Sequence, residues 1–481
     1  MQNANQPSKD HIQGILLKGY SKYPHAFYVM LQIEDPAKCK SWLGQTTFQH
    51  MTSEMAEFPL NIAFTSKGLT KLGIQNLEER GFGRAFVEGM DTGHRRRTLG
   101  DVGENNPDGW KWGGKKKDEI HLMLMLFGKE REALKQVFEE QKKVWQQSGM
   151  NYLHELEGNF IENKDRGHVE HFGFRDGISQ PEIRELGHPK RIRRFEEAGK
   201  LDHLLNPGEF VLGYKNAYDK LPHSPSFPEA GVDVAKGGSY MVFRQIEQDV
   251  KCFWKTLHKY VEEDDAHYTQ TIALAAKMMG RHPDGRPLIP LAKNAQNDWN
   301  DFRFYHEDPK GQVCPFGAHI RRTNPRDTLS SKGKAKSIEG AIKVSNKHRI
   351  LRRGRTYGSP VVEGMNIEEV VRASLEGDVQ GARGLHFICF NTDIQRQFEF
   401  VQHSWSNNRK FAGRYQEVDP IIGVMVKEKG DGMEKSEFEV PAYPVRKRYQ
   451  SLPPFVRTQG GAYFFLPSIP FIQFLSQYPT S

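Results

Sequence analysis

The chain has 481 residues, of which 37% are hydrophobic and 11% are aromatic, and this composition excludes both a disordered chain and a single small domain. Its 68 lysine and arginine residues outnumber 60 aspartate and glutamate residues, which gives a net charge of +8. The basic residues occur in short runs such as 94–97 and 191–194, which are usually solvated faces and less often sites that attract an anionic ligand.

The first half of the chain alternates a predicted strand with a predicted helix three times. Each unit begins with a run rich in β-branched, aromatic or large apolar residues and continues with a helical pattern. The predicted strands cover residues 25–33, 59–64 and 119–127, and the helical patterns follow from residues 35, 65 and 128.

The second half restarts the same plan after an irregular, proline-containing stretch over residues 201–236. Its predicted strands cover residues 237–246, 384–390 and 460–466, and a helical pattern follows each of them. No glycine-rich phosphate loop follows the first strand, which argues against a doubly wound parallel sheet. We predict an α+β fold of two ferredoxin-like domains, residues 1–230 and 231–481, each an antiparallel β-sheet with packed helices.

The four cysteines are far apart and form no C-x-x-C pair, which argues against a disulfide framework and a structural zinc site. They are Cys39, Cys252, Cys314 and Cys389. The first twenty residues show no pattern of an export signal, and no segment approaches the roughly 20 apolar residues that cross a bilayer. We therefore expect a cytoplasmic protein without a membrane span.

Three segments carry residues that could do chemistry. The first, residues 171–181, contains a G-x-x-D-G pattern with Asp176 as its acid; taken alone, it predicts a tight turn. The second, residues 314–327, places His319 between two prolines with three arginines nearby, where an imidazole could meet a metal and cations could meet carboxylates, although a single histidine is more often structural. The third, residues 348–358, contains Arg352 and predicts a basic strand end or a phosphate-binding patch.

Together, and in this order, the three segments resemble the dye-decolourising peroxidase family. Further similarity over residues 11–20, 390–405 and 455–470 extends the resemblance over almost the whole chain. In that family the G-x-x-D-G segment supplies a distal aspartate, a following histidine binds haem iron, and a downstream arginine completes the distal side. The resemblance therefore implies that Asp176 and Arg352 are catalytic and that His319 is the iron ligand.

The resemblance also implies a function. It predicts a peroxidase with haem b (iron protoporphyrin IX), held mainly by the C-terminal half, that uses hydrogen peroxide to oxidise dyes, phenolics or other aromatic donors through a high-valent ferryl intermediate. A haem-handling protein of the deferrochelatase type is the first alternative. A basic RNA-binding protein is the second, and the absence of an aromatic-glycine strand of the RRM kind argues against a nucleic-acid partner. The sequence leaves the oligomeric state open.

Chemical reasoning adds supporting residues to this site. A metal-bound imidazole needs an acceptor for its second nitrogen, and Asp393 is the predicted partner, with helix N-cap as an equal alternative. Haem propionates need cations, and Arg322 is favoured over its neighbours Arg321 and Arg326. Tyr357 and Trp405 could relay electrons from bulky dyes, although packing is the commoner role of an aromatic side chain.

Overall fold

A sheet of nine antiparallel strands forms the centre of the protein. The computed structural model describes residues 7–114, 119–197, 203–261, 268–291, 298–330, 335–377, 379–427, 430 and 432–479. Strand β12 (Gly384–Asn391) pairs with β11 (Arg355–Tyr357) on one side and with β9 (Ser239–Gln248) on the other. Because this pairing joins the two ends of the strand order, the sheet closes into a barrel, which leaves few backbone groups unpaired.

Each half of the chain contributes a sheet of the predicted ferredoxin-like kind. In the first half the order is β4-β1-β3-β2, formed by β1 (His25–Ile33), β2 (Leu60–Phe64), β3 (Leu122–Gly128) and β4 (Met150–Asn159). In the second half it is β11-β12-β9-β17, with the short β10 (Leu351–Arg352) beside β12 and with β17 (Val456–Leu466) at the other edge. The predicted α+β fold is thus confirmed.

The two half-sheets do not stay separate. Strand β17 meets β2 at the pair Phe465↔Phe64, and β11 meets β4 at the pair Thr356↔Asn159. These two seams merge the halves into one barrel, which the repeated strand and helix pattern did not predict. The domain boundary between residues 230 and 231 stays a prediction.

Alternation along the strands separates the inside of the barrel from its outside. Tyr28, Met125 and Phe243 belong to the cluster inside the barrel, whereas their neighbours on the chain pack outward. Because both faces of these strands are buried, their sequences are nearly continuous apolar runs and not alternating ones. On β12 the alternation directs His386 inward, against the ring of Tyr28, and places Leu385 and Phe387 on the outer face.

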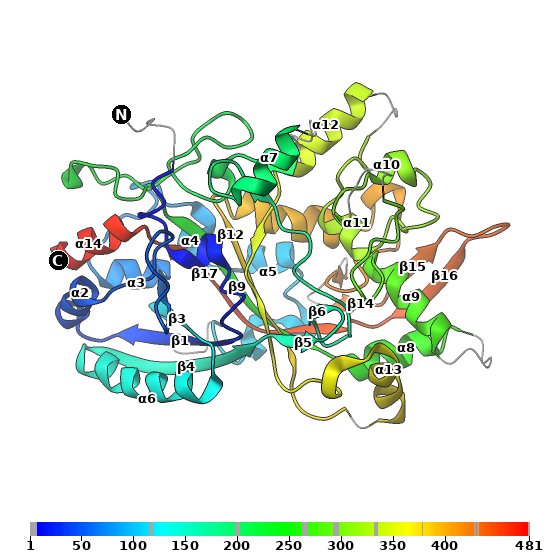
Figure 1. Ribbon diagram of the computed structural model, residues 1–481, viewed down its shortest axis with the longest axis horizontal. Coiled ribbons are helices and arrows are strands. Elements are labelled where there is room, and N and C mark those ends of the chain that lie inside the picture. Colours follow the sequence, from blue (N-terminus) through cyan, green and yellow to red (C-terminus); the bar gives the residue numbers. More distant parts are fainter. Residues whose placement is uncertain are drawn as a thin grey trace.

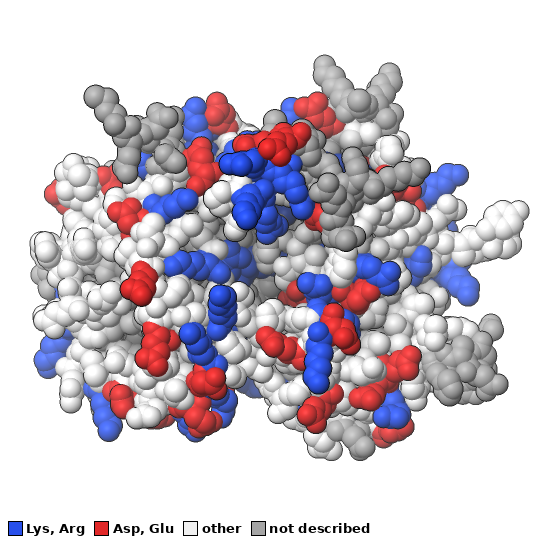
Figure 2. All heavy atoms as spheres, in the orientation of Figure 1, with Lys and Arg blue, Asp and Glu red and all other residues white. Residues whose placement is uncertain are grey.

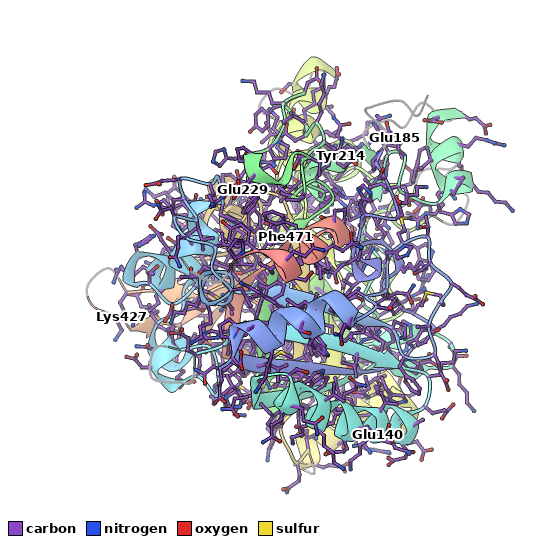
Figure 3. All side chains as sticks on the ribbon, turned by 90° about the vertical axis from the view of Figure 1, so that its left-hand side faces the viewer. Glu140, Glu185, Tyr214, Glu229, Lys427 and Phe471 are labelled. Atoms are coloured by element: carbon purple, nitrogen blue, oxygen red, sulfur yellow. The ribbon has the colours of Figure 1, made fainter. Side chains whose placement is uncertain are left out.

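Helices cover the outer face of the half-sheet that the first half of the chain forms. Helix α2 (Pro36–Gln45) starts where the Asp35 carboxylate accepts the backbone N–H of Lys38, and it packs against α14 (Ile469–Gln477) near the other end of the chain (Figure 1). Helix α6 (Arg131–Gln147) buries its apolar stripe on the sheet. In Figure 3 these helices face the viewer, with Glu140 on the solvent side of α6.

A second group of helices lies on the C-terminal side of the barrel, at the right of Figure 1. It includes α8 (Val250–His258), α9 (Thr269–Met279), α11 (His319–Thr323) and α13 (Ile367–Glu376). The segment predicted as a helix after β12 forms two π-helical turns, η7 (Gln395–Glu399) and η8 (Val401–Ser406). Among the described residues, no helix is both long and apolar enough to cross a membrane.

Candidate active site

A cavity of about 280 Å³ lies between the barrel and the C-terminal group of helices. The outer face of three strands forms one wall, with Ile246 from β9, Leu385 and Phe387 from β12, and Val456 from β17. Met279 of α9 and His319 of α11 belong to its lining as well. An apolar cavity with a few convergent polar groups is the usual form of a cofactor site.

His319 is the first residue of α11 and is fixed by a buried carboxylate. Its Nδ1 lies 2.9 Å from Oδ2 of Asp419, and the Asp419 side chain is fully buried. The other oxygen of Asp419 accepts the backbone N–H groups of Ile421 and Ile422 at 2.9 and 3.1 Å. Burial alone would raise the pKa of Asp419, but His319 and the two N–H groups hold it below its ordinary value. The ionised Asp419 therefore accepts Nδ1–H and leaves Nε2 of His319 available to a metal.

The predicted imidazole partner, Asp393, does not occupy this position. Its carboxylate accepts the backbone N–H of Arg396 at 3.0 Å in the first turn of η7, and it lines a different cavity. Asp393 therefore has the capping role that was its alternative. No sequence pattern marked Asp419, which is followed by a proline and an apolar run and lies 100 residues from His319.

Asp176 and Arg352 meet at the same cavity, as the motif order predicts. Arg352 Nη1 lies 3.3 Å from Asp176 Oδ1, and the two side chains are 29% and 46% exposed. The backbone N–H of Arg352 donates to Gln180 Oε1, and that of Asp176 donates to the carbonyl of His168. Gly177, the last residue of the motif, has a φ of +76°, a left-handed conformation that favours glycine.

The same two side chains also line a second cavity, of about 710 Å³. This cavity extends from β10 and β11 to the start of α7 (Pro189–Glu197), where His188 and Arg191 contribute to its wall. A small molecule in the second cavity would therefore reach Asp176 and Arg352 directly.

Comparisons with known proteins agree with this geometry. The model of the DyP dimeric alpha+beta barrel domain matches residues 11–160. Peroxidase 2 of Mycetinis scorodonius is 31% identical over an alignment that covers 96% of this chain and 86% of that protein. The multifunctional dye peroxidase of Amycolatopsis sp. is 30% identical, with 91% and 86% covered.

The chain belongs to the dye-decolourising peroxidase family.

A solved structure shows the same fold. The Auricularia auricula-judae dye-decolourising peroxidase complexed with imidazole has a TM-score of 0.75 and 25% identity, and the match covers 98% of this chain and 99% of that one. The chain is thus a peroxidase, which uses hydrogen peroxide and a donor substrate, and its family consists of haem enzymes. A deferrochelatase of Yersinia pestis is 29% identical over only 35% of the chain.

The peroxidase's cavity fits a haem, because a free imidazole nitrogen faces a mostly apolar lining to which several arginines also belong. Arg281, Arg326 and Arg349 all belong to the lining, and none of them makes an ion pair within the described part of the chain. Burial and the neighbouring Arg352 lower the pKa of Arg349 to about 10, and burial lowers that of Arg326 strongly. Clustered guanidinium groups without a counterion form a site for carboxylates.

Arg322, the favoured candidate for a propionate partner, is not among the cavity-lining residues. Its buried guanidinium donates to the backbone carbonyls of Trp405, Asn408 and Glu417 at 2.8 to 3.0 Å. Arg322 therefore ties α11 to the neighbouring segments instead of facing the cavity. The closeness of Arg322 to His319 in sequence did not predict the direction of the Arg322 side chain, because the side chains of a five-residue helix point in all directions around its axis.

The two aromatic candidates for electron relay are buried. Tyr357 is 8% exposed and stacks on His386 at a ring-centroid distance of 4.7 Å. Trp405 is 4% exposed and packs edge-on against His348. Neither side chain offers an open face to a bulky dye in this conformation.

Proposed function

We propose that the cavity would bind haem b through His319, and that Asp176 and Arg352, which line the same cavity, carry out the peroxide chemistry. The observation that carries the proposal is that His319, oriented by Asp419, and the Asp176–Arg352 pair line one apolar cavity. Haem, when bound, supplies the iron that takes peroxide and stores its oxidising equivalents. No cysteine lines the cavity within the described ranges, which supports haem b rather than a thioether-linked haem.

Asp176 and Arg352 then divide the work on the peroxide. Asp176 Oδ accepts the proton of the entering peroxide and returns it to the departing oxygen, and its half-exposed side chain can exchange protons with solvent. Arg352 holds the peroxide oxygens with its rigid fork of donors and stabilises the negative charge that develops on the leaving oxygen. The 3.3 Å contact keeps the two groups in place before peroxide arrives.

The arginines on the cavity wall complete the site. Arg349 and Arg326 replace Arg322 as the proposed partners of the propionates, because both line the cavity and neither forms an ion pair among the described residues. Arg326 also donates to the carbonyl of Asn300 at 2.7 Å, which fixes its side chain against the wall.

Dyes, phenolics or other aromatic molecules are the proposed donors, and the second cavity is their proposed route to Asp176 and Arg352. Figure 2 shows lysine and arginine side chains gathered over α7, at the end of this cavity. Those cations would favour anionic donors. The cytoplasm is the proposed location; the four unpaired cysteines support a reducing compartment.

Peroxide turnover of the haem-loaded protein tests the proposal. We expect oxidation of an anthraquinone dye with hydrogen peroxide, and slower reaction with peroxide in Asp176→Asn and Arg352→Leu at full haem loading. Wild-type rates in both variants would refute the two roles. Release of iron with free porphyrin, and no dye oxidation, would favour the haem-handling alternative.

A further inference from the structure

Glu170 is a buried acid that the mechanism above does not use. It follows β6 (Gly167–Val169), is 7% exposed, and lines both cavities together with Asp176 and Arg352. A carboxylate taken out of water needs hydrogen bonds to every oxygen. The hydrogen-bond partners of Glu170 therefore identify the segment that this side chain holds in place.

All of its partners but one belong to the loop that leads to Asp176. Glu170 Oε2 accepts the backbone N–H of Phe172 at 2.8 Å, and Oε1 accepts that of Phe174 at 2.9 Å. The backbone of Glu170 pairs with the same loop, since its N–H donates to the carbonyl of Phe174 and its carbonyl accepts from Gly173. One side chain thus fixes the turn that ends two residues before Asp176.

The remaining partner anchors this loop to the barrel. Gln248, the last residue of β9, donates its side-chain N–H to Glu170 Oε2 at 2.5 Å. The amide of Gln248 is itself 5% exposed, so the contact is shielded from water. The loop therefore takes its position from the same strand that forms the cavity wall.

We infer that Glu170 is a positioning residue for the peroxidase reaction, which holds the loop 172–174 so that Asp176 stays against Arg352 at the meeting point of the two cavities. This inference rests on the role proposed for Asp176. Truncating Glu170 leaves Phe172 N–H and Phe174 N–H without an acceptor, and replacing it by glutamine leaves one of them without its acceptor; both changes let Asp176 move away from the arginine.

Charged neighbours act on Glu170 from two sides. Asp176 faces it from its own loop, and Arg166 faces it while donating to the carbonyls of Gly173 and Met365. Burial, reinforced by Asp176, raises the pKa of Glu170 to about 7 against the opposing hydrogen bonds from Gln248 and the loop. Its protonation near neutral pH removes an acceptor from the loop.

Hydrogen–deuterium exchange of the haem-loaded protein gives a readout that is independent of activity. In Glu170→Gln, at least one of the amides of Phe172 and Phe174 should exchange about tenfold faster or more, because a side-chain amide replaces one acceptor oxygen by a donor. Glu170→Asp, which keeps the charge on a shorter side chain, should lie between Glu170→Gln and wild type and covers the case that Glu170→Gln fails to load haem. Unchanged exchange of both amides in a loaded variant would overturn the inference.

Kinetics with peroxide separates positioning from a general loss of stability. Glu170→Gln should slow the reaction with hydrogen peroxide about tenfold, and the double variant with Asp176→Asn should be no slower than Asp176→Asn alone. If the double variant reacts slower than Asp176→Asn by the same factor that Glu170→Gln shows alone, Glu170 does not act through Asp176. If Asp176→Asn itself reacts at the wild-type rate, the proposed catalytic role of Asp176 fails, while the exchange data still decide whether Glu170 holds the loop.

Glu209→Gln is the matched control. Glu209 is likewise a buried carboxylate that accepts a backbone N–H, from Ala217 at 2.7 Å, and it is absent from the lining of both cavities. We expect it to lower stability without changing the exchange of residues 172 and 174 or the peroxide rate. A peroxide rate that falls equally in Glu209→Gln would show that the effect of Glu170 is not specific.

Discussion

Nδ1 of His319 lies 2.9 Å from Oδ2 of Asp419, which joins two segments 100 residues apart at the cofactor cavity. The carboxylate is buried and accepts three hydrogen bonds, so it cannot turn away from the imidazole without leaving N–H groups unpaired. This contact turns Nε2 of His319 toward the cavity, and the carboxylate increases the electron density on the imidazole ring.

Replacing Asp419 should change the cofactor more than the fold around it. Asp419→Asn keeps the shape but removes the charge, so we expect a higher iron reduction potential, and Asp419→Ala should lose about 10-fold to 100-fold in haem affinity. Spectroelectrochemistry and haem titration measure the two effects. Asp393→Asn is the control and should leave both quantities unchanged; an effect of Asp393 equal to that of Asp419 would contradict the assignment.

Gly317 should not tolerate a side chain. Gly317 lies two residues before His319, and a Cβ at this position would lie 1.9 Å from Oε1 of the buried Glu417. Gly317→Ala should therefore destabilise the protein by about 1 to 3 kcal/mol and weaken haem binding, as urea unfolding and haem titration would show. Gly340→Ala in α12 (Ala335–Asn346), where no atom lies within 4 Å, should be neutral or stabilising. Equal free energies of unfolding and equal haem affinities in the two variants would contradict the predicted steric clash at residue 317.

Replacing Arg349 should weaken haem binding, whereas replacing Arg322 should lower the stability of the fold. Arg349→Leu removes a cation from the cavity wall, so we expect about tenfold weaker haem binding at nearly unchanged stability of the haem-free protein. Arg322→Leu leaves three backbone carbonyls without their donor and should lower the free energy of unfolding by about 2 to 4 kcal/mol. Urea unfolding and haem titration measure the two effects. If Arg322→Leu weakens haem binding at unchanged stability and Arg349→Leu lowers stability instead, Arg322 and not Arg349 is the propionate partner.

Glu170 should make the haem-free protein less stable as the pH rises toward neutrality. Its folded pKa of about 7 lies above the ordinary value of 4.5, so between these values the folded chain holds a proton that the unfolded chain has released. The free energy of unfolding should fall by an amount on the order of 2 kcal/mol over this range, and Glu170→Gln should show a smaller fall. Urea unfolding at pH 5 and pH 8 measures the difference, and identical pH dependence in both proteins would contradict it.

The strands could be predicted where burial imposes a simple pattern. β1, β3 and β12 are nearly continuous apolar runs, and α6 carries its apolar residues at helical spacing. β4 was missed because most of its residues are only partly buried and two of them, Glu155 and Glu157, are charged. Closure of the barrel was also missed, since the seams consist of single residue pairs such as Phe465↔Phe64 that no local pattern marks.

The candidate site could be predicted in part for a similar reason. His319, Asp176 and Arg352 stand in motifs with a fixed order, and the structure brings all three to one cavity. Asp419 and Glu170 act through contacts that depend on the folded chain, so no spacing in the sequence connects them with the residues that they hold.

The resonance Raman and absorption spectra of His319→Ala test the central claim most directly. The wild-type protein should show an iron bound to a histidine that is hydrogen-bonded to a carboxylate, with its Soret band at full intensity. His319→Ala should lose the iron–histidine stretch and either lose haem or bind it through another ligand. An unchanged histidine-ligated spectrum in His319→Ala would contradict the assignment of the iron ligand.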